Sequence, residues 1–296
     1  MLFRTRSFLF ILAALLCLAA HPAQAGHGHD RPDKTGILLV AFGTSIPEAQ
    51  TVFDTIDQRV RNAHPGTPVR WAFTSSIIRD KIERTQGENL DSVQQALADM
   101  ADQGFTRVAV QSLHTIPGQE FHDLRATIGA FDGLPGGLED VSLGMPLLSS
   151  DSDLRRVADA LLANLPGERS GSEAAVFMGH GTHHPANVYY PGLQYYLWER
   201  DPLAFVGVVE GAPPLNEVET KLAERGVERV WLLPFMSVAG DHARNDMAGD
   251  EPGSWKSVLR DKGYEVEVVL TGTAAYDQVV NVWLDHLHTA LERLPR

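Results

Sequence analysis

The chain repeats one pattern, in which a short run of apolar residues is followed by a longer stretch with apolar residues at helical spacing. In the first repeat the run GILLVAF at 36–42 precedes an apolar stripe from Val52 to Val60. A continuous aliphatic run predicts a strand buried on both faces, and the spaced residues predict an amphipathic helix. Pro47 marks the start of this helix, and the HPGTP turn at 64–68 marks its end.

The same alternation continues to the end of the chain. Further strands are predicted at 69–74, 106–113, 141–143, 174–178, 204–209, 230–235 and 265–270. Helices are predicted at 90–102, after the segment 111–120 with His122 in the first turns, at 154–165, at 215–225 and at 276–294, and a Tyr-rich helix is predicted to end near 198. Strands that alternate with helices form parallel sheets with crossover helices. We therefore expect an α/β fold of two Rossmann-like lobes, at 36–150 and 151–296, with a cleft between them and the last helix packed on the N-terminal lobe.

The first residues have the order of an export signal. Arg4 and Arg6 precede an apolar run at 8–20 and a small-residue site that ends at Ala25. This order predicts a signal peptide at 1–25, cleavage after Ala25, a periplasmic location and a flexible segment at 26–35. Because the run has about 13 residues and a membrane span needs about 20, the sequence argues against a membrane anchor.

Composition limits the chemistry that the protein can perform. The only cysteine, Cys17, lies in the predicted signal peptide, so a disulfide or a thiolate ligand is not expected in the mature chain. The formal charge of -13 disfavours binding to nucleic acid and suits a cationic substrate. A simpler interpretation is that the charge keeps an exported protein soluble.

Three residues with metal-binding side chains follow three predicted strands of the second lobe. His180 follows the strand at 174–178, Glu210 directly follows the strand at 204–209, and His242 lies in the loop after the strand at 230–235. The carboxyl ends of neighbouring parallel strands meet at one edge of a sheet. Two imidazoles and a carboxylate at this edge are a typical ligand set for a divalent transition metal. Taken singly, each residue could equally be a turn residue or a solvated strand end.

Other residues near the predicted strand ends are candidate substrate contacts. They are Gly43, Thr44, Ser45, His114, Glu120, Gly181 and Gly211. The segment 43–45 precedes a helix and offers N–H groups to carboxylates, and glycines allow close approach of a large planar ligand. His114 is a candidate for proton removal or for contact with a substrate carboxylate, with a loop-stabilising hydrogen bond as the alternative.

Five segments resemble a known family. They are MGHGTHHPAN at 178–187, VEGAP at 209–213, MSVAGDHARNDMAGDEP at 236–252, VAFGTS at 40–45 and QSLHTIPGQEF at 111–121. All five are similar to motifs of the anaerobic sirohydrochlorin cobalt chelatases, which share their fold with ferrochelatases. The resemblance implies two lobes that enclose a tetrapyrrole and an ion held by His180, Glu210 and His242. The export signal departs from this family, which is usually described as cytoplasmic.

The resemblance implies insertion of Co²⁺ into sirohydrochlorin with release of two protons. Glu210 would compensate the charge of the ion and accept a pyrrole proton. Fe²⁺ and Ni²⁺ remain open, because imidazole and carboxylate accept all three metals. Four residues are candidates either for apolar walls of the macrocycle site or for the core: Phe42, Met178, Phe235 and Met236.

Other functions remain open at this stage. One is iron insertion into sirohydrochlorin or a porphyrin, another is a metallohydrolase, although the chain lacks HExxH, and a third is a periplasmic carrier of metal, tetrapyrrole or haem. His122 is a candidate ligand for an accessory haem, and a homo-oligomer is compatible with the sequence. His286 and His288, on the last predicted helix, are interpreted as surface residues.

Overall fold

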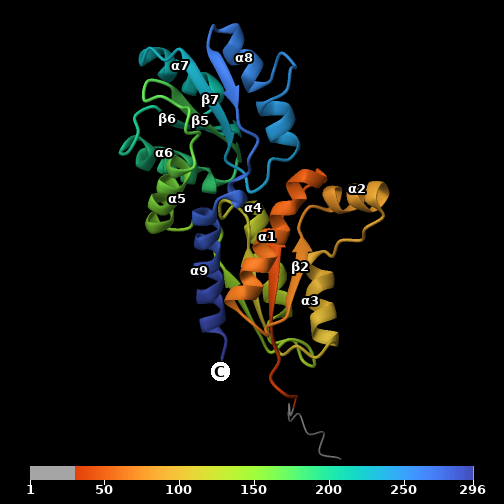
Figure 1. The fold of residues 1–296 in the computed structure, drawn as a ribbon. Coiled ribbons are helices and arrows are strands. Elements are labelled where there is room, and N and C mark those ends of the chain that lie inside the picture. Colours follow the sequence, from red (N-terminus) through yellow and green to blue (C-terminus); the bar gives the residue numbers. More distant parts are fainter. Residues whose placement is uncertain (1–30, 296) are drawn as a thin grey trace, which may run out of the picture. The chain divides into compact units, whose positions relative to one another are not determined.

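A computed structural model of the protein describes residues 31–295, which contain two four-stranded parallel sheets with helices packed on them (Figure 1). The α/β fold predicted from the sequence is confirmed. The predicted signal peptide at 1–25 lies outside the described residues. From Pro32 onward the chain forms one compact unit. No helix within residues 31–295 combines the length and the apolar content that crossing a bilayer requires.

The first sheet has the strand order β2-β1-β3-β4. Its strands are β1 (Thr35–Ala41), β2 (Val69–Phe73), β3 (Arg107–Ser112) and β4 (Asp140–Gly144), and the helices in this part of the chain are α1 (Pro47–Ala63), α2 (Ser76–Gln86), α3 (Val93–Asp102) and α4 (Gln119–Phe131). Ile37 and Leu39 of β1 belong to one apolar cluster, and Leu38 and Val40 belong to another. Because successive side chains of a strand point to opposite faces, a strand covered on both faces needs a continuous apolar run.

The second sheet has the strand order β6-β5-β7-β8. Its strands are β5 (Ala174–Gly181), β6 (Ala204–Glu210), β7 (Arg229–Pro234) and β8 (Glu265–Val268). The remaining helices are α5 (Asp151–Ala163), α6 (Tyr189–Trp198), α7 (Leu215–Glu224), α8 (Trp255–Asp261) and α9 (Asp277–Arg293), with short turns η1 (Pro185–Val188), η2 (Ala243–Met247, a π-helix) and η3 (Thr273–Ala275). All pairs of strands are parallel, so β5, β6 and β7 end at the same edge.

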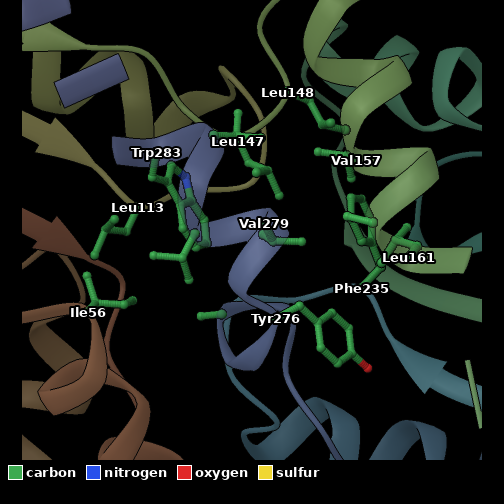
Figure 2. Packing of buried hydrophobic residues seen from close by; sticks show 14 of the residues in the cluster. Ile56, Leu113, Leu147, Leu148, Val157, Leu161, Phe235, Tyr276, Val279 and Trp283 are labelled. Carbon is green, nitrogen blue, oxygen red and sulfur yellow. The ribbon is translucent and has the colours of Figure 1, made fainter. Parts of the chain in front are cut away.

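Helix α9 ends the chain but packs against β3 and β4 of the first sheet. The Ser142 hydroxyl on β4 donates a hydrogen bond of 2.6 Å to the carbonyl of Ala290 on α9. Figure 2 shows Val279 and Trp283 of this helix in one apolar cluster with Ile56 of α1 and with residues of α5. The last helix therefore joins both parts of the chain through a shared core.

Two helices, α2 and α8, do not appear among the elements predicted from the sequence. Helix α2 buries only Ile82, so it has no apolar stripe that could be recognised in its sequence. Helix α8 has seven residues and buries Trp255 and Leu259. The helical state of both depends on the parts of the protein that they contact and on the N-cap hydroxyl groups of Ser75 and Ser254.

His286 is not a surface residue, so that prediction is wrong, whereas His288 is exposed as expected. The His286 Nδ1 atom donates to the carbonyl of Met145 at 3.0 Å, and its Nε2 atom donates to the Asp153 carboxylate at 3.2 Å. The contact between His286 and Asp153 links α9 to the start of α5. The sequence could not reveal this pair because its members are more than a hundred positions apart.

The Asp153 carboxylate is buried and held by several donors. Burial raises the pKa of this group, but hydrogen bonds from His286, Ser149 and Ser150 outweigh that effect and lower the pKa to about 2. A folded-state pKa below the unfolded value near 3.9 stabilises the fold at pH values above about 4. This contribution is lost as the pH falls from about 4 towards 2.

We expect Asp153→Asn to lower the free energy of unfolding by about 2 kcal/mol at pH 6, because the substitution removes the ionised partner of His286. Urea unfolding followed by circular dichroism between pH 6 and pH 2.5 measures the effect. The difference from the unmodified protein should shrink as the pH falls below about 4.

Asp285→Asn is the matched control for this prediction. Asp285 lies on the same helix α9 and pairs with Arg156 at 2.6 Å, but its side chain is exposed. Exposed ion pairs contribute about 0 to 1 kcal/mol, so this variant should unfold nearly as the unmodified protein does. Equal destabilisation by the two substitutions would show that burial of the Asp153 pair has no special effect.

Candidate metal site

The three predicted metal ligands all lie at the carboxyl edge of the second sheet. His180 is the last residue but one of β5, and Glu210 is the last residue of β6, where it pairs in register with Gly181. His242 follows β7 and directly precedes the π-helix η2. The sequence prediction of a shared edge is confirmed by the strand order.

The structure brings two of the three ligands together. The ring centroids of His180 and His242 are 4.6 Å apart, and the rings are nearly perpendicular. The Nδ1 atom of His180 donates to the carbonyl of Gly181 at 3.0 Å, and the Nδ1 atom of His242 donates to the carboxylate of Asp246. A neutral imidazole protonated at Nδ1 has its lone pair at Nε2. Both rings are thus in the tautomer that binds a metal through Nε2.

Glu210 does not complete a three-ligand group in this conformation. Within residues 31–295, no three His, Cys, Asp or Glu side chains stand together in an arrangement that could hold an ion. The Glu210 side chain is exposed at the strand end. The structure therefore contains the histidine pair, and the contribution of Glu210 stays a prediction.

Two glycines of the predicted site are required by packing within the protein. Gly181 has φ +76°, and a Cβ atom placed on it would lie 1.8 Å from the carbonyl oxygen of Glu210. Gly211 has φ +94°, and its Cβ would lie 2.8 Å from Asn187 and from the carbonyl of Thr182. Only glycine fits these positions. The structure thus gives a different reason for both glycines than approach of a planar ligand, and their contact with substrate stays a prediction.

Two residues that position the site were missed by the sequence analysis. Asn187 accepts a hydrogen bond from the Thr182 amide at 3.2 Å and donates one to the Ala212 carbonyl at 2.7 Å. The loop after His180 is thereby tied to the loop after Glu210. The Tyr190 hydroxyl accepts a hydrogen bond from the Gly181 amide at 3.3 Å, and burial raises the pKa of Tyr190 to about 12.

The loop that contains His242 is braced against elements of the first sheet. The Ser237 hydroxyl donates a hydrogen bond of 3.0 Å to the carbonyl of Leu113, which follows β3. Asp241, directly before His242, forms an ion pair of 3.4 Å with Lys81 of α2. These contacts position the second histidine from the opposite side of the site.

The candidate substrate contacts in the first half of the chain are largely buried. Thr44 is 4% exposed and Ser45 is 9% exposed, and α1 begins two residues after Ser45. His114 is also buried, and burial lowers its pKa to about 4. Its ring contacts the hydroxyls of Ser112 at 2.8 Å and Thr74 at 3.4 Å. These hydrogen bonds match the alternative interpretation, in which His114 stabilises its loop. Contact of His114 with substrate stays a prediction.

Glu120 and the glycine at position 43 differ in exposure. Glu120 is exposed in the first turn of α4, whereas Gly43 is buried and has φ +102°. Side chains of Ile78 and Phe73 lie 3.2 to 3.3 Å from the position of a Cβ on Gly43. Contact of either residue with substrate stays a prediction.

The four candidate wall residues separate into two groups. Phe42 is 48% exposed at the carboxyl end of β1 and remains available to an apolar ligand. Met178 and Phe235 are fully buried, so they are core residues. Met236 is partly buried and packs against the apolar cluster that contains Met178. The sequence analysis missed further exposed apolar residues, among them Ile77, Val188 and Val209.

His122 is exposed near the start of α4 and lies beside His184. Their ring centroids are 5.0 Å apart. The Nδ1 atom of His184 accepts a hydrogen bond of 3.1 Å from the Ala186 amide. The neutral His184 ring therefore has its proton at Nε2 and does not present a free lone pair towards His122.

A family model matches almost the whole described chain. Residues 35–292 match the model described as Cobalt chelatase (CbiK). The chain belongs to this cobalt chelatase family. The match includes both sheets and all three predicted metal ligands, so it confirms the family resemblance found in the sequence.

Relatives with curated names support this membership in the cobalt chelatase family. The chain is 45% identical over 261 residues to the sirohydrochlorin cobaltochelatase CbiKC of Nitratidesulfovibrio vulgaris, an alignment that covers 88% of this chain and 92% of the relative. It is 35% identical over 259 residues to the sirohydrochlorin cobaltochelatase of Salmonella typhimurium, with coverage of 87% and 97%. The solved structure of SirB from Bacillus subtilis with Fe³⁺ has the same fold, with a TM-score of 0.57, 18% identity and coverage of 87% and 95%.

Proposed function

We propose that this protein is a sirohydrochlorin cobaltochelatase, a lyase that inserts Co²⁺ into the tetrapyrrole and releases two protons. The observation that supports this most directly is the His180–His242 pair, because both rings have Nε2 free for an ion at the sheet edge. Two curated relatives whose alignments cover most of the chain are named sirohydrochlorin cobaltochelatases.

The reaction requires a donor set that holds Co²⁺ and then releases it to the ring nitrogens. Neutral imidazoles are donors of moderate strength that satisfy both requirements. His180 and His242 hold the ion, and Glu210, exposed at the neighbouring strand end, compensates its charge and accepts the proton of a pyrrole nitrogen. One Co²⁺ enters the ring as two protons leave, so the charge of the products equals that of the reactants.

The macrocycle needs an apolar surface near the histidine pair. Phe42 at the end of β1 and Val209 next to Glu210 are exposed apolar residues from the two sheets. Exposed apolar side chains at strand ends are the type of surface on which a flat ligand packs. In this proposal the faces of the tetrapyrrole pack on these two side chains.

The decisive experiment is absorbance spectroscopy of sirohydrochlorin with the purified protein and Co²⁺, Fe²⁺ or Ni²⁺ in turn. We expect metallation with Co²⁺ well above the spontaneous rate, and slower metallation with the other two ions. Faster insertion of Fe²⁺ would make the protein an iron chelatase. A protein that binds sirohydrochlorin without accelerating metallation by any ion would be a carrier, and the proposal would fail.

The Asp246 carboxylate positions His242 through the hydrogen bond to Nδ1. Loss of such a partner typically lowers metal affinity about 10- to 100-fold, so we expect Asp246→Ala to weaken Co²⁺ binding by about tenfold and Asp246→Asn by less. Competition with a chromophoric chelator measures the affinity. Asp250→Asn is the control, since Asp250 is exposed and its carboxylate pairs with Lys256. If Asp246→Ala and Asp250→Asn bind Co²⁺ equally, Asp246 does not position the ligand.

We further propose export of this enzyme, based on the charged start, apolar run and small-residue site of residues 1–25. The exported chain would begin at Gly26. Mass spectrometry of the protein from the periplasmic fraction tests the proposal, and an intact Met1 on that protein would contradict it.

We also propose that His122 binds an accessory haem. Its ring is exposed and lies beside His184, which is already bonded to a backbone amide. Haem titration should produce a Soret band that is lost in His122→Ala and kept in His183→Ala, a nearby exposed histidine. Equal bands in both variants would assign the haem to another ligand.

A further inference from the structure

A cavity of about 500 Å³ is lined entirely by residues from the first half of the chain. Its lining comes from α1, from β2 and from α2 with the segment that follows it, and includes Phe53, Trp71 and Glu88. None of His180, Glu210 and His242 is among the lining residues. Its volume is in the range of cavities that bind small molecules.

One wall of the cavity is aromatic. Trp71 and Phe73 of β2 are stacked, with centroids 6.0 Å apart and an interplanar angle of 13°. Phe53 of α1 lies 5.3 Å from Trp71 and 5.7 Å from Phe73, with its ring tilted towards both. The Trp71 ring is only partly buried, so part of this wall faces the cavity. The faces of such rings attract cations.

The charged residues that line the cavity are all acidic, and one of the three is paired with an arginine outside the lining. Asp54, Asp57 and Glu88 line it, and no Lys, Arg or His is among the lining residues. Asp57 is engaged by Arg61 and by the Trp71 indole N–H at 3.0 Å. Within the part of the chain that the structure describes, Asp54 and Glu88 form no ion pair.

We propose that this cavity binds a small organic cation, an ammonium or amidinium group attached to a flat apolar body. The apolar body packs on Trp71, and Asp54 and Glu88 neutralise the cationic head. A tetrapyrrole with acidic side chains is disfavoured there, because it would face the carboxylates of Asp54 and Glu88. The aromatic wall is equally unsuited to a bare metal ion, which needs oxygen or nitrogen ligands.

Benzylamine is a suitable probe, with benzyl alcohol and benzoate as its neutral and anionic counterparts. Isothermal titration calorimetry with the purified protein should detect benzylamine and neither counterpart. Asp54→Asn combined with Glu88→Gln should weaken benzylamine binding about tenfold, because both unpaired charges are removed. Asp99→Asn combined with Glu217→Gln is the control, since it removes the same charge from exposed positions outside the cavity and should leave binding unchanged.

Three results would overturn the proposal. They are absence of benzylamine binding, equal binding of benzyl alcohol, and equal weakening by the cavity and control variants. A further test compares this cavity with the proposed macrocycle site, because the Thr44 hydroxyl at the cavity edge lies 3.3 Å from the position of a Cβ on Gly240, two residues before His242. Benzylamine should bind unchanged when sirohydrochlorin is saturating, and displacement by sirohydrochlorin would assign the cavity to the macrocycle instead.

Discussion

His180→Ala and His242→Ala are each expected to reduce cobalt insertion by more than about 100-fold. Loss of a residue that only hydrogen-bonds to a metal ligand already lowers metal affinity about 10- to 100-fold, and loss of the ligand itself should have a larger effect. Each substitution removes one of the two imidazoles that the structure places together. The contacts proposed for the macrocycle are with other residues, so its affinity should change little. Stopped-flow absorbance measures insertion, and fluorescence quenching measures tetrapyrrole binding.

Glu210→Gln separates the roles within this site. It keeps the size of the side chain but removes its charge and its ability to accept a proton. We expect it to lower the rate of insertion more than the occupancy of the ion. His183→Ala is the control, because His183 is an exposed histidine three residues from His180. If both His180→Ala and His242→Ala insert cobalt at near-normal rates, the metal site lies elsewhere.

Gly181→Ala is expected to destabilise the fold by about 3 kcal/mol and to abolish insertion. The added Cβ would lie 1.8 Å from the Glu210 carbonyl oxygen, and the residue would have to keep a φ of +76°. Relief of this clash must separate the ends of β5 and β6, which position His180 and Glu210. Thermal unfolding and the insertion assay measure the two effects.

Gly226→Ala distinguishes the clash from backbone strain. Gly226 has φ +63° and an open environment, with nothing within 4 Å of its Cβ position. Its replacement should cost about 1 kcal/mol, the cost of a left-handed conformation alone, and should leave insertion intact. Equal losses of stability in the two variants would mean that β5 and β6 tolerate the extra atom.

The strands were largely predictable because each is a local pattern of apolar residues. The run at 36–42 became β1 at Thr35–Ala41, and the last predicted helix at 276–294 became α9 at Asp277–Arg293. Helix α2 was not predictable in this way, since it buries a single residue, Ile82. Elements that depend on distant contacts leave little periodicity in their own sequence.

The proximity of His180 and His242 was predictable because topology brings the ends of parallel strands together. The roles of Asn187 and Tyr190 were not, since each acts through a hydrogen bond between loops whose separation only the structure gives. The same holds for Asp246, whose contact with His242 depends on the turn formed by η2. The packing around Gly181 could not be predicted from the sequence either, because the atom that would clash with a side chain, the carbonyl oxygen of Glu210, belongs to another strand.

The position of α9 has a consequence for biosynthesis. The face of β3 and β4 that this helix covers is completed by residues that are synthesised long after these strands, so a nascent chain cannot cover this face of its first sheet before α9 has been made. Ribosome-bound chains that stop before Asp277 should therefore remain sensitive to protease in the part of the chain that forms the first sheet.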